Sequence, residues 1–198
     1  MRLRYSPTSP FARKVRVAAA HLGFELELEL ADTGNEADTL MAQNPLGKLP
    51  VLLDEPVGPL FDSPVILEWL DHKAGGGRIL PSEPHARFAA LRTEALADGI
   101  MDAALLVVYE NRFRPEAVRY SPWIERQQVK VYRALDVLEA ESAALPADIT
   151  VGTIALACAL DYVELRLGAG WREGRPALVA WLAAFAERCP RFADSAPA

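Results

Sequence analysis

Two short segments of the chain combine residue types that can bind a peptide by its backbone and by its charged end. In Leu49-Pro50, a turn leads directly into the apolar stretch Val51–Leu53. Proline has no N–H and belongs at the first residue of a strand or at a bend. A cis bond before it would turn the backbone polar groups of Leu49 outward. Asp62-Ser63 opens a helical pattern, and helix N-termini bind anions. Together the segments predict a surface that holds a short peptide.

The elements that must position these segments alternate along residues 1–80. Strands are predicted at 2–5, 25–30, 51–53 and 59–61, and helices at 10–21, 36–42 and 63–71. Ser9 is a suitable N-cap for the first helix, and Pro10 occupies the first helical position, where its missing N–H costs nothing. The alternation of Glu and Leu over 25–30 indicates an edge strand with one wet face. This order predicts a small α/β unit with a βαβ crossover and a hairpin.

The remainder of the chain is predicted to be helical. Glycines 75–77 and the segment Pro81–Pro84 read as a linker. Helices are expected near 84–110, 121–145, 153–167 and 176–188, with Thr150 as a helix N-cap. We therefore expect two domains, an α/β domain over residues 1–80 and an all-helical domain over residues 84–198.

Composition and charge argue against several functions. Hydrophobic residues make up 51% and charged residues 24% of the 198, which is typical of a soluble globular protein. The net charge is −6 with no block of like charge, so neither nucleic acid nor a membrane is an expected partner. No secretory signal is expected, and Cys158 and Cys189 stand far apart, which favours a reducing, cytoplasmic location. The scattered His21, His72 and His85 support neither a metal site nor a histidine-based triad.

The motifs and their order resemble those of the glutathione S-transferases along the whole chain. A thioredoxin-like unit with Leu49-Pro50 and Asp62-Ser63 precedes a helical bundle, as in that family. The segment 9–16, Ser-Pro-Phe-Ala-Arg-Lys-Val-Arg, is most similar to a bacterial branch, and so is the segment 94–103, Glu-Ala-Leu-Ala-Asp-Gly-Ile-Met-Asp-Ala. The resemblance implies a thioredoxin-like N-terminal domain followed by an all-helical domain, with glutathione as co-substrate and no metal.

The resemblance places the reacting thiol of glutathione beside the first turn. A thiol with a pKa of about 8.5 is mostly protonated at neutral pH, so a donor and a positive potential must stabilise the thiolate. Ser9, at the helix N-terminus, is the first candidate donor, and Thr8, Ser6 and Tyr5 are the alternatives; Ser9 could also serve only as a cap. Because this turn contains no cysteine, thiol–disulfide exchange through a protein thiol is not expected there.

Further roles follow residue by residue from the same resemblance. Leu49 and Pro50 would pair with the cysteinyl backbone of glutathione, and Lys48 would approach the glycyl carboxylate or stay solvated. Ser63 would bind the γ-glutamyl carboxylate and Asp62 the ammonium group. Asp98 would reach that ammonium across a two-fold homodimer, whereas Asp102 is as well explained by solvation.

A second-substrate pocket is expected between Phe11 and the first helices of the helical domain, with Tyr109 at its edge or in the core. The implied activity is attack of the glutathione thiolate on a small hydrophobic electrophile, in detoxification. The alternatives are a non-catalytic module that binds glutathione or a protein, and a specialised glutathione-dependent isomerase or dehalogenase. Where the family has Asp three residues after the cap Thr150, this chain has Thr153, a poorer partner for the cap N–H.

Overall fold

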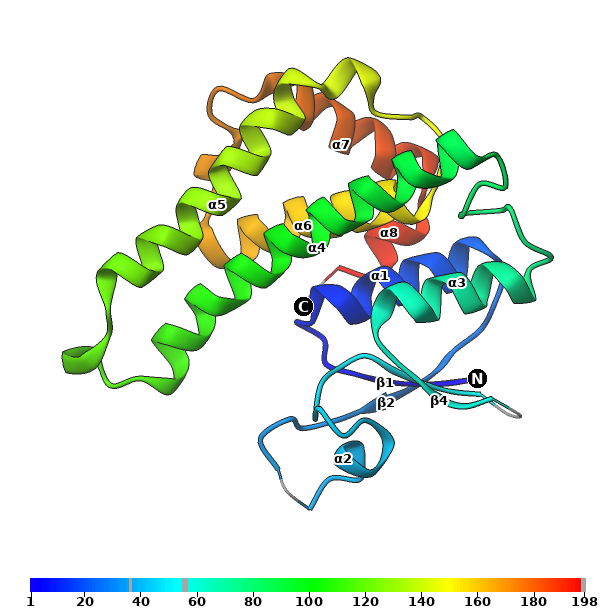
Figure 1. Ribbon diagram of the computed structural model, residues 1–198, viewed down its shortest axis with the longest axis horizontal. Helices are drawn as coiled ribbons and strands as arrows, with labels where there is room; N and C mark the ends of the chain where they lie inside the picture. The colour runs from blue at the N-terminus through cyan, green and yellow to red at the C-terminus, as the bar shows by residue number, and fades with distance from the viewer. Residues whose placement is uncertain (36, 55–56, 197–198) are drawn as a thin grey trace.

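A computed structural model describes residues 1–35, 37–54 and 57–196 (Figure 1). The first part of the chain is a sheet with three helices, in the order β1 (Arg2–Tyr5), α1 (Pro10–His21), β2 (Glu27–Leu30), α2 (Leu40–Gln43), β3 (Val51–Asp54), β4 (Gly58–Leu60) and α3 (Ser63–Lys73). Helices α1 and α3 lie side by side on one face of the sheet, and α2 lies on the other (Figure 1). The predicted thioredoxin-like arrangement is confirmed.

The strand order in the sheet is β2-β1-β3-β4. β1 pairs in parallel with β2 and antiparallel with β3, and β4 pairs antiparallel with β3. The predicted edge position of β2 is therefore confirmed, but its predicted buried face is wrong: Leu28 and Leu30 are 42% and 65% exposed. The buried layer is centred on the inner strands, where Leu3 and Leu52 are fully buried, and it does not extend to the edge.

Some predicted boundaries shift. β2 begins at Glu27 rather than at residue 25, and α3 continues to Lys73. The helix expected over 36–42 is confined to α2, and residue 36 lies outside the described residues. A helix of four residues cannot be stabilised by its own hydrogen bonds, so periodicity is a weak guide to its limits.

The second part of the chain is helical: α4 (Pro84–Phe113), α5 (Ser121–Ala140), α6 (Val151–Leu167), α7 (Pro176–Arg188) and α8 (Arg191–Asp194), with short 3-10 turns at 116–118, 142–144 and 169–172. α6 packs along α4 and is buried around most of its circumference (Figure 1). Gly152 permits this close approach, because a Cβ there would lie 2.5 Å from the carbonyl oxygen of Ala90. α5 ends before the predicted residue 145, at Ala140.

The N-terminus of α6 is capped more completely than the sequence suggested. Thr150 Oγ1 accepts the N–H of Thr153 at 3.2 Å, and Thr153 Oγ1 accepts the N–H of Thr150 at 2.8 Å. Thr153 is fully buried and close to the cap, so its short side chain makes the return bond for which a longer one is more usual.

The linker between the two parts is fixed by one carboxylate. Asp71, near the end of α3 and 4% exposed, accepts the backbone N–H groups of the linker at 2.7–3.2 Å, from Gly77, Arg78, Ile79 and Leu80. The N–H of Val151 then donates to the carbonyl of Ile79 at 2.8 Å, which ties the start of α6 to the same segment. The orientation of the helical part is therefore fixed by buried polar contacts.

Candidate functional site

Three turns meet at one end of the sheet. The register places Arg4 of β1 opposite Val51 of β3, and Leu60 of β4 opposite Leu52 of β3. The turn after β1, which leads to Ser9, therefore lies beside the segment that precedes β3 and beside the segment that follows β4. Sheet topology thus brings together Ser9, Leu49-Pro50 and Asp62-Ser63, although these residues are far apart in sequence.

The Leu49–Pro50 peptide bond is cis, which is the form that turns the backbone polar groups of Leu49 outward. Leu49 lies just before β3, and neither its N–H nor its C=O pairs with another backbone group among the described residues. Pro50 is buried and Leu49 is half-buried, so this segment presents free backbone groups from a firmly packed position. An extended peptide can pair with such groups as an added strand does.

Asn44 holds the loop before Leu49, a role that the sequence analysis missed. Its side chain is 2% exposed and donates to the carbonyl of Lys48 at 2.9 Å. Its Oδ1 accepts the N–H of Leu46 at 3.0 Å, and its own backbone carbonyl accepts the N–H of Gly47 at 2.8 Å. Gly47 has a φ of +61°, a conformation that other residues rarely adopt. The Asn-x-x-Gly spacing in the sequence was the available signal for this turn.

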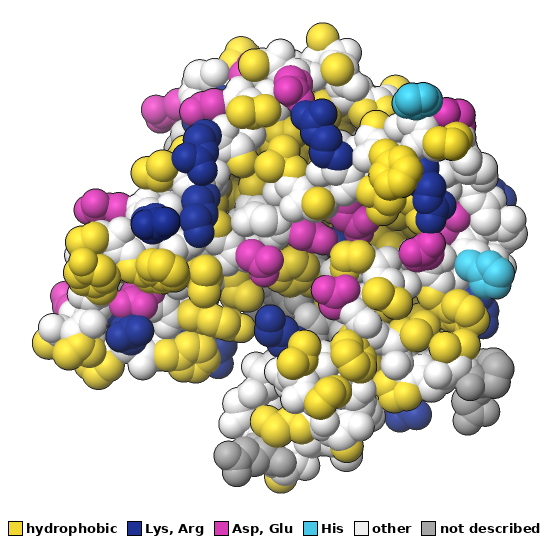
Figure 2. Space-filling view, in the orientation of Figure 1, with side chains coloured by type: hydrophobic (Ala, Val, Ile, Leu, Met, Phe, Trp, Pro, Cys, Tyr) yellow, Lys and Arg dark blue, Asp and Glu magenta, His cyan; other side chains and the backbone are white. Residues whose placement is uncertain are grey.

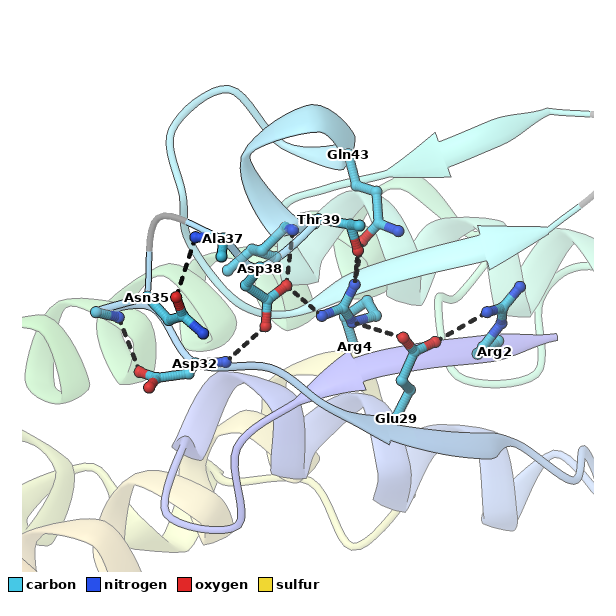
Figure 3. A network of polar contacts seen from close by, with 11 residues as sticks. Arg2, Arg4, Glu29, Asp32, Asn35, Ala37, Asp38, Thr39 and Gln43 are labelled. Carbon is cyan, nitrogen blue, oxygen red and sulfur yellow. Dashed lines mark hydrogen bonds and ion pairs between the residues drawn. The ribbon is translucent and has the colours of Figure 1, made fainter.

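Arg4 anchors α2 and thereby the start of this loop (Figure 3). Its guanidinium donates to Thr39 Oγ1 and Gln43 Oε1, both at 2.8 Å, and pairs with Asp38 at 2.5 Å. Arg4 is 2% exposed although it lies on β1. Hydrogen bonds to the backbone N–H groups of residues 32 and 40 are the main reason that the pKa of Asp38 lies below its ordinary value.

Asp62 and Ser63 stand at the start of α3, as predicted. Asp62 is the N-cap residue, but its exposed carboxylate does not cap the helix, so it is free to accept another donor. Ser63 is 2% exposed, and its hydroxyl has no hydrogen-bond partner among the described residues. The helix N-terminus attracts an anion, whereas the carboxylate of Asp62 attracts a cation. A zwitterionic amino-acid group satisfies both requirements.

Ser9 caps α1, and its Oγ accepts the N–H of Ala12 at 3.2 Å. An oxygen that accepts from the helix still has its own O–H to donate, so capping and thiolate stabilisation are compatible. A small hollow adjoins this turn and is lined by Thr8, Ser9, Pro10, Arg13, Cys158 and Tyr162. Among the alternative hydroxyl donors, Thr8 therefore lines the same hollow as Ser9. Tyr5 instead lies beneath the Arg16 guanidinium, 5.5 Å from the ring centre, and the Ser6 carbonyl accepts the N–H of Ser9.

Two basic residues near the start of α1 join the two parts of the molecule, which the sequence did not predict. Arg13 donates to Asp161 at 2.9 Å and to Ser195 Oγ at 3.1 Å. Lys14 is fully buried and donates to Glu94 at 2.9 Å and to both oxygens of Asp98, at 2.7 and 2.8 Å. Their positions beside the apolar stripe of α1 were the only sequence signal.

Asp98 is therefore paired with Lys14 of the same chain. Its contact with the γ-glutamyl ammonium across a homodimer stays a prediction. Burial raises the pKa of Asp98 to about 6, with Lys14 opposing the shift. One turn further along α4, burial also raises the pKa of Asp102, while Lys48 opposes the shift and Asp62 adds to it. Asp102 is thus close enough to Lys48 and Asp62 for their charges to affect its pKa.

The remaining predicted residues, Lys48, Phe11 and Tyr109, are not among the residues that line the hollow. Lys48 is exposed, and Phe11 is half-buried against the core. Tyr109 on α4 is 40% exposed and lies edge-on to Phe113, with 5.2 Å between the ring centres. Figure 2 shows an indentation between the α/β part and the end of the molecule formed by α4 and α5.

Comparison with known proteins agrees with this geometry. The profile of the glutathione S-transferase N-terminal domain matches residues 3–78, and that of the C-terminal domain matches residues 121–184. The Escherichia coli K12 protein YibF, described as an uncharacterized GST-like protein, is 40% identical over 184 residues, which cover 90% of each chain. The chain belongs to the glutathione S-transferase family.

Solved structures of related proteins align with the whole length of this chain. A glutathione transferase family member from Pseudomonas fluorescens Pf-5, crystallised with bound glutathione, has a TM-score of 0.93 at 37% identity, covering 100% of this chain and 98% of that one. The same Pseudomonas protein was crystallised with S-(propanoic acid)-glutathione; that structure has a TM-score of 0.88 at 37% identity and covers 100% of both chains.

Two further findings concern the described part of this transferase-family protein. No helix in residues 1–35, 37–54 or 57–196 is both long and apolar enough to cross a membrane. Across the same residues, no three His, Cys, Asp or Glu side chains are grouped so that they could hold a metal ion.

Proposed function

We propose that this protein binds glutathione and catalyses attack of the glutathione thiolate on a small electrophile. One observation carries the proposal: the free backbone groups of Leu49, the uncommitted Asp62-Ser63 pair and the start of α1 lie at one end of the sheet. These groups match the cysteinyl backbone, the γ-glutamyl zwitterion and the thiol of a single tripeptide. The glutathione-bound relative supports this assignment.

In the proposed reaction, Ser9 donates its hydroxyl to the thiolate while α1 supplies positive potential from its N-terminus. The thiol proton leaves to water. The sulfur lone pair forms a C–S bond, and either a leaving group departs with its bonding electrons or the π electrons of a conjugated double bond shift and are protonated by water. Lys48 is proposed to approach the glycyl carboxylate, and Phe11 and Tyr109 to border the electrophile.

Titration calorimetry with glutathione tests binding. Micromolar to millimolar affinity supports the proposal, whereas absence of binding contradicts both the transferase and the glutathione-binding module. A panel containing an aryl halide and an organic hydroperoxide then separates the transferase from the non-catalytic module, because only an enzyme accelerates such reactions. Isomerase or dehalogenase activity would indicate the specialised alternative.

The role of Ser9 is tested by the thiol pKa of bound glutathione, followed by the ultraviolet absorbance of the thiolate. In Ser9→Ala we expect this pKa to rise towards the free value of about 8.5, because the donor is lost. Thr8→Ala, which removes the neighbouring hydroxyl of the same turn, is the matched control. An unchanged pKa in Ser9→Ala removes Ser9 from the mechanism, and a rise only in Thr8→Ala transfers the role to Thr8.

We also propose that two copies form a homodimer in which Asp98 approaches the γ-glutamyl ammonium of the neighbouring site. Large apolar side chains on α3 and α4 are exposed, among them Val65 at 45% and Phe88 at 69%. Sedimentation measures the mass directly. A monomer at the concentrations used for the assay would rule out a role for Asp98 across an interface.

A further inference from the structure

A ridge on α6 leads outward from the hollow beside Ser9. Cys158 and Tyr162 both line that hollow, and Arg166 follows at the same spacing of four residues. Residues four apart share one face of a helix, so Arg166 continues the ridge by one more turn. The central carbon of its guanidinium lies 5.4 Å from the centre of the Tyr162 ring. A cation thus stands one side chain away from the predicted position of the reacting sulfur.

Arg166 differs from its neighbours because its charge is not neutralised. Arg172 pairs with Glu164 and Arg175 with Asp136, each at 2.5 Å. Arg166 makes no ion pair with a described residue, and its Nε is buried without a hydrogen-bond partner among them. Because Nε itself is shielded from solvent, a ligand would reach the terminal nitrogens of the guanidinium. The guanidinium fork suits a carboxylate, which it can bind through two parallel hydrogen bonds.

Neutral phenol groups complete the surroundings of this cation. Tyr162 is 3% exposed; burial raises the pKa of its hydroxyl, and this shift is only partly opposed by the charge of Arg166 and by a hydrogen bond between the two side chains. The hydroxyl therefore stays protonated at neutral pH and does not neutralise the guanidinium. Tyr109 on α4 is close enough to influence the same titration, and with Phe113 it forms an aromatic wall. An apolar wall and an unpaired cation together favour a substrate with an apolar body and an anionic end.

We propose that Arg166 selects, as second substrate, electrophiles that carry a carboxylate near the reacting carbon. This inference rests on the proposed function, because it assumes that glutathione places its sulfur over Ser9. A carboxylate on the carbon chain attached to that sulfur would extend along the α6 ridge to the guanidinium. A neutral electrophile would leave the charge of the guanidinium without a counter-ion and would bind less tightly.

Binding of preformed conjugates tests the inference without depending on turnover. Calorimetry compares glutathione, S-(2-carboxyethyl)glutathione and S-propylglutathione, of which the last two have equal carbon chains and differ in the carboxylate. We expect the wild-type protein to bind the carboxyethyl conjugate about tenfold more tightly than the propyl conjugate, as one charge-assisted contact allows. In Arg166→Gln the preference should vanish while the affinity for S-propylglutathione stays unchanged. Arg166→Lys, which keeps the charge without the fork, should retain a reduced preference.

Arg172→Gln is the matched control, because it removes a nearby guanidinium that is already paired with Glu164. This variant should keep the preference for the carboxyethyl conjugate over the propyl conjugate. Equal wild-type affinity for the two conjugates, or a preference that persists in Arg166→Gln, would overturn the assignment to Arg166 while leaving glutathione binding intact. If the wild-type protein binds none of the three ligands, the proposed function itself fails, and the inference fails with it. Retained affinity for glutathione also shows that each variant is folded.

Discussion

Replacement of Lys14 by methionine tests the polar contact between the two parts of the molecule most directly. The ammonium group lies 2.9 Å from Glu94 and 2.7 Å from Asp98, and the exposed fractions of the three side chains are 0%, 4% and 19%. Methionine fills a similar volume but leaves two buried carboxylates facing each other without a cation. Removal of one partner from a buried ion pair costs about 3–5 kcal/mol, so we expect the free energy of unfolding to fall by that amount.

The size of this loss follows from opposing terms. Across 2.8 Å the attraction of one pair is about 6 kcal/mol at an effective dielectric constant near 20. Dehydration of the ions costs several kcal/mol each, so the intact cluster stabilises the fold little, whereas an incomplete cluster destabilises it strongly. The triple variant Lys14→Met, Glu94→Gln, Asp98→Asn removes every charge and should recover most of the loss, to within about 2 kcal/mol of the wild-type protein.

The loss should also depend on pH. Burial already raises the pKa of Asp98 to about 6, and Lys14 opposes that shift, so its removal raises this pKa further. Above the unfolded-state pKa, the folded variant then holds a proton that the unfolded chain has released, and stability falls as pH rises through the folded-state pKa. The loss in free energy of unfolding caused by Lys14→Met should therefore be small near pH 4 and reach its full value near pH 8.

Urea unfolding followed by circular dichroism measures these differences. Lys73→Met is the matched control, because Lys73 pairs with Asp54 at 2.8 Å with its side chain 32% exposed, and such a pair contributes about 0–1 kcal/mol. If Lys14→Met costs no more than the control, or if the triple variant is no more stable than the single one, the argument from buried charge is refuted.

Two further predictions concern α3. Ser63→Ala should weaken glutathione binding measured by calorimetry by about 1–3 kcal/mol, because the γ-glutamyl carboxylate loses a buried donor; unchanged affinity would exclude the hydroxyl from the site. Asp71→Asn should lower the free energy of unfolding by about 2–3 kcal/mol in urea, because an amide offers one acceptor oxygen to the linker N–H groups instead of two. Glu68→Gln on the same helix removes only an exposed pair with Arg87 and should stay within about 0.5 kcal/mol of the wild-type protein; an equal loss in both variants would refute the special role of Asp71.

Local signals predicted much of the fold. The Ser9-Pro10 pair predicted the start of α1, and the limits predicted for α7, 176–188, agree with the structure. Both are consequences of capping and helical periodicity, which act over a few residues. The edge position of β2 was also predicted, but its buried face was not, because burial depends on how far the helices extend across the sheet.

The sequence by itself determined which residues can hold a tripeptide: the Leu49-Pro50 turn, the Asp62-Ser63 helix start and the hydroxyls before α1 have their chemistry wherever the chain places them. Only the tertiary structure decided what supports them. The partners of Arg13 and Lys14 lie up to 182 residues away, and the unpaired charge of Arg166 is apparent only when its neighbours are paired. Such contacts leave no periodic pattern in a sequence, because they depend on packing between segments and not on spacing within one.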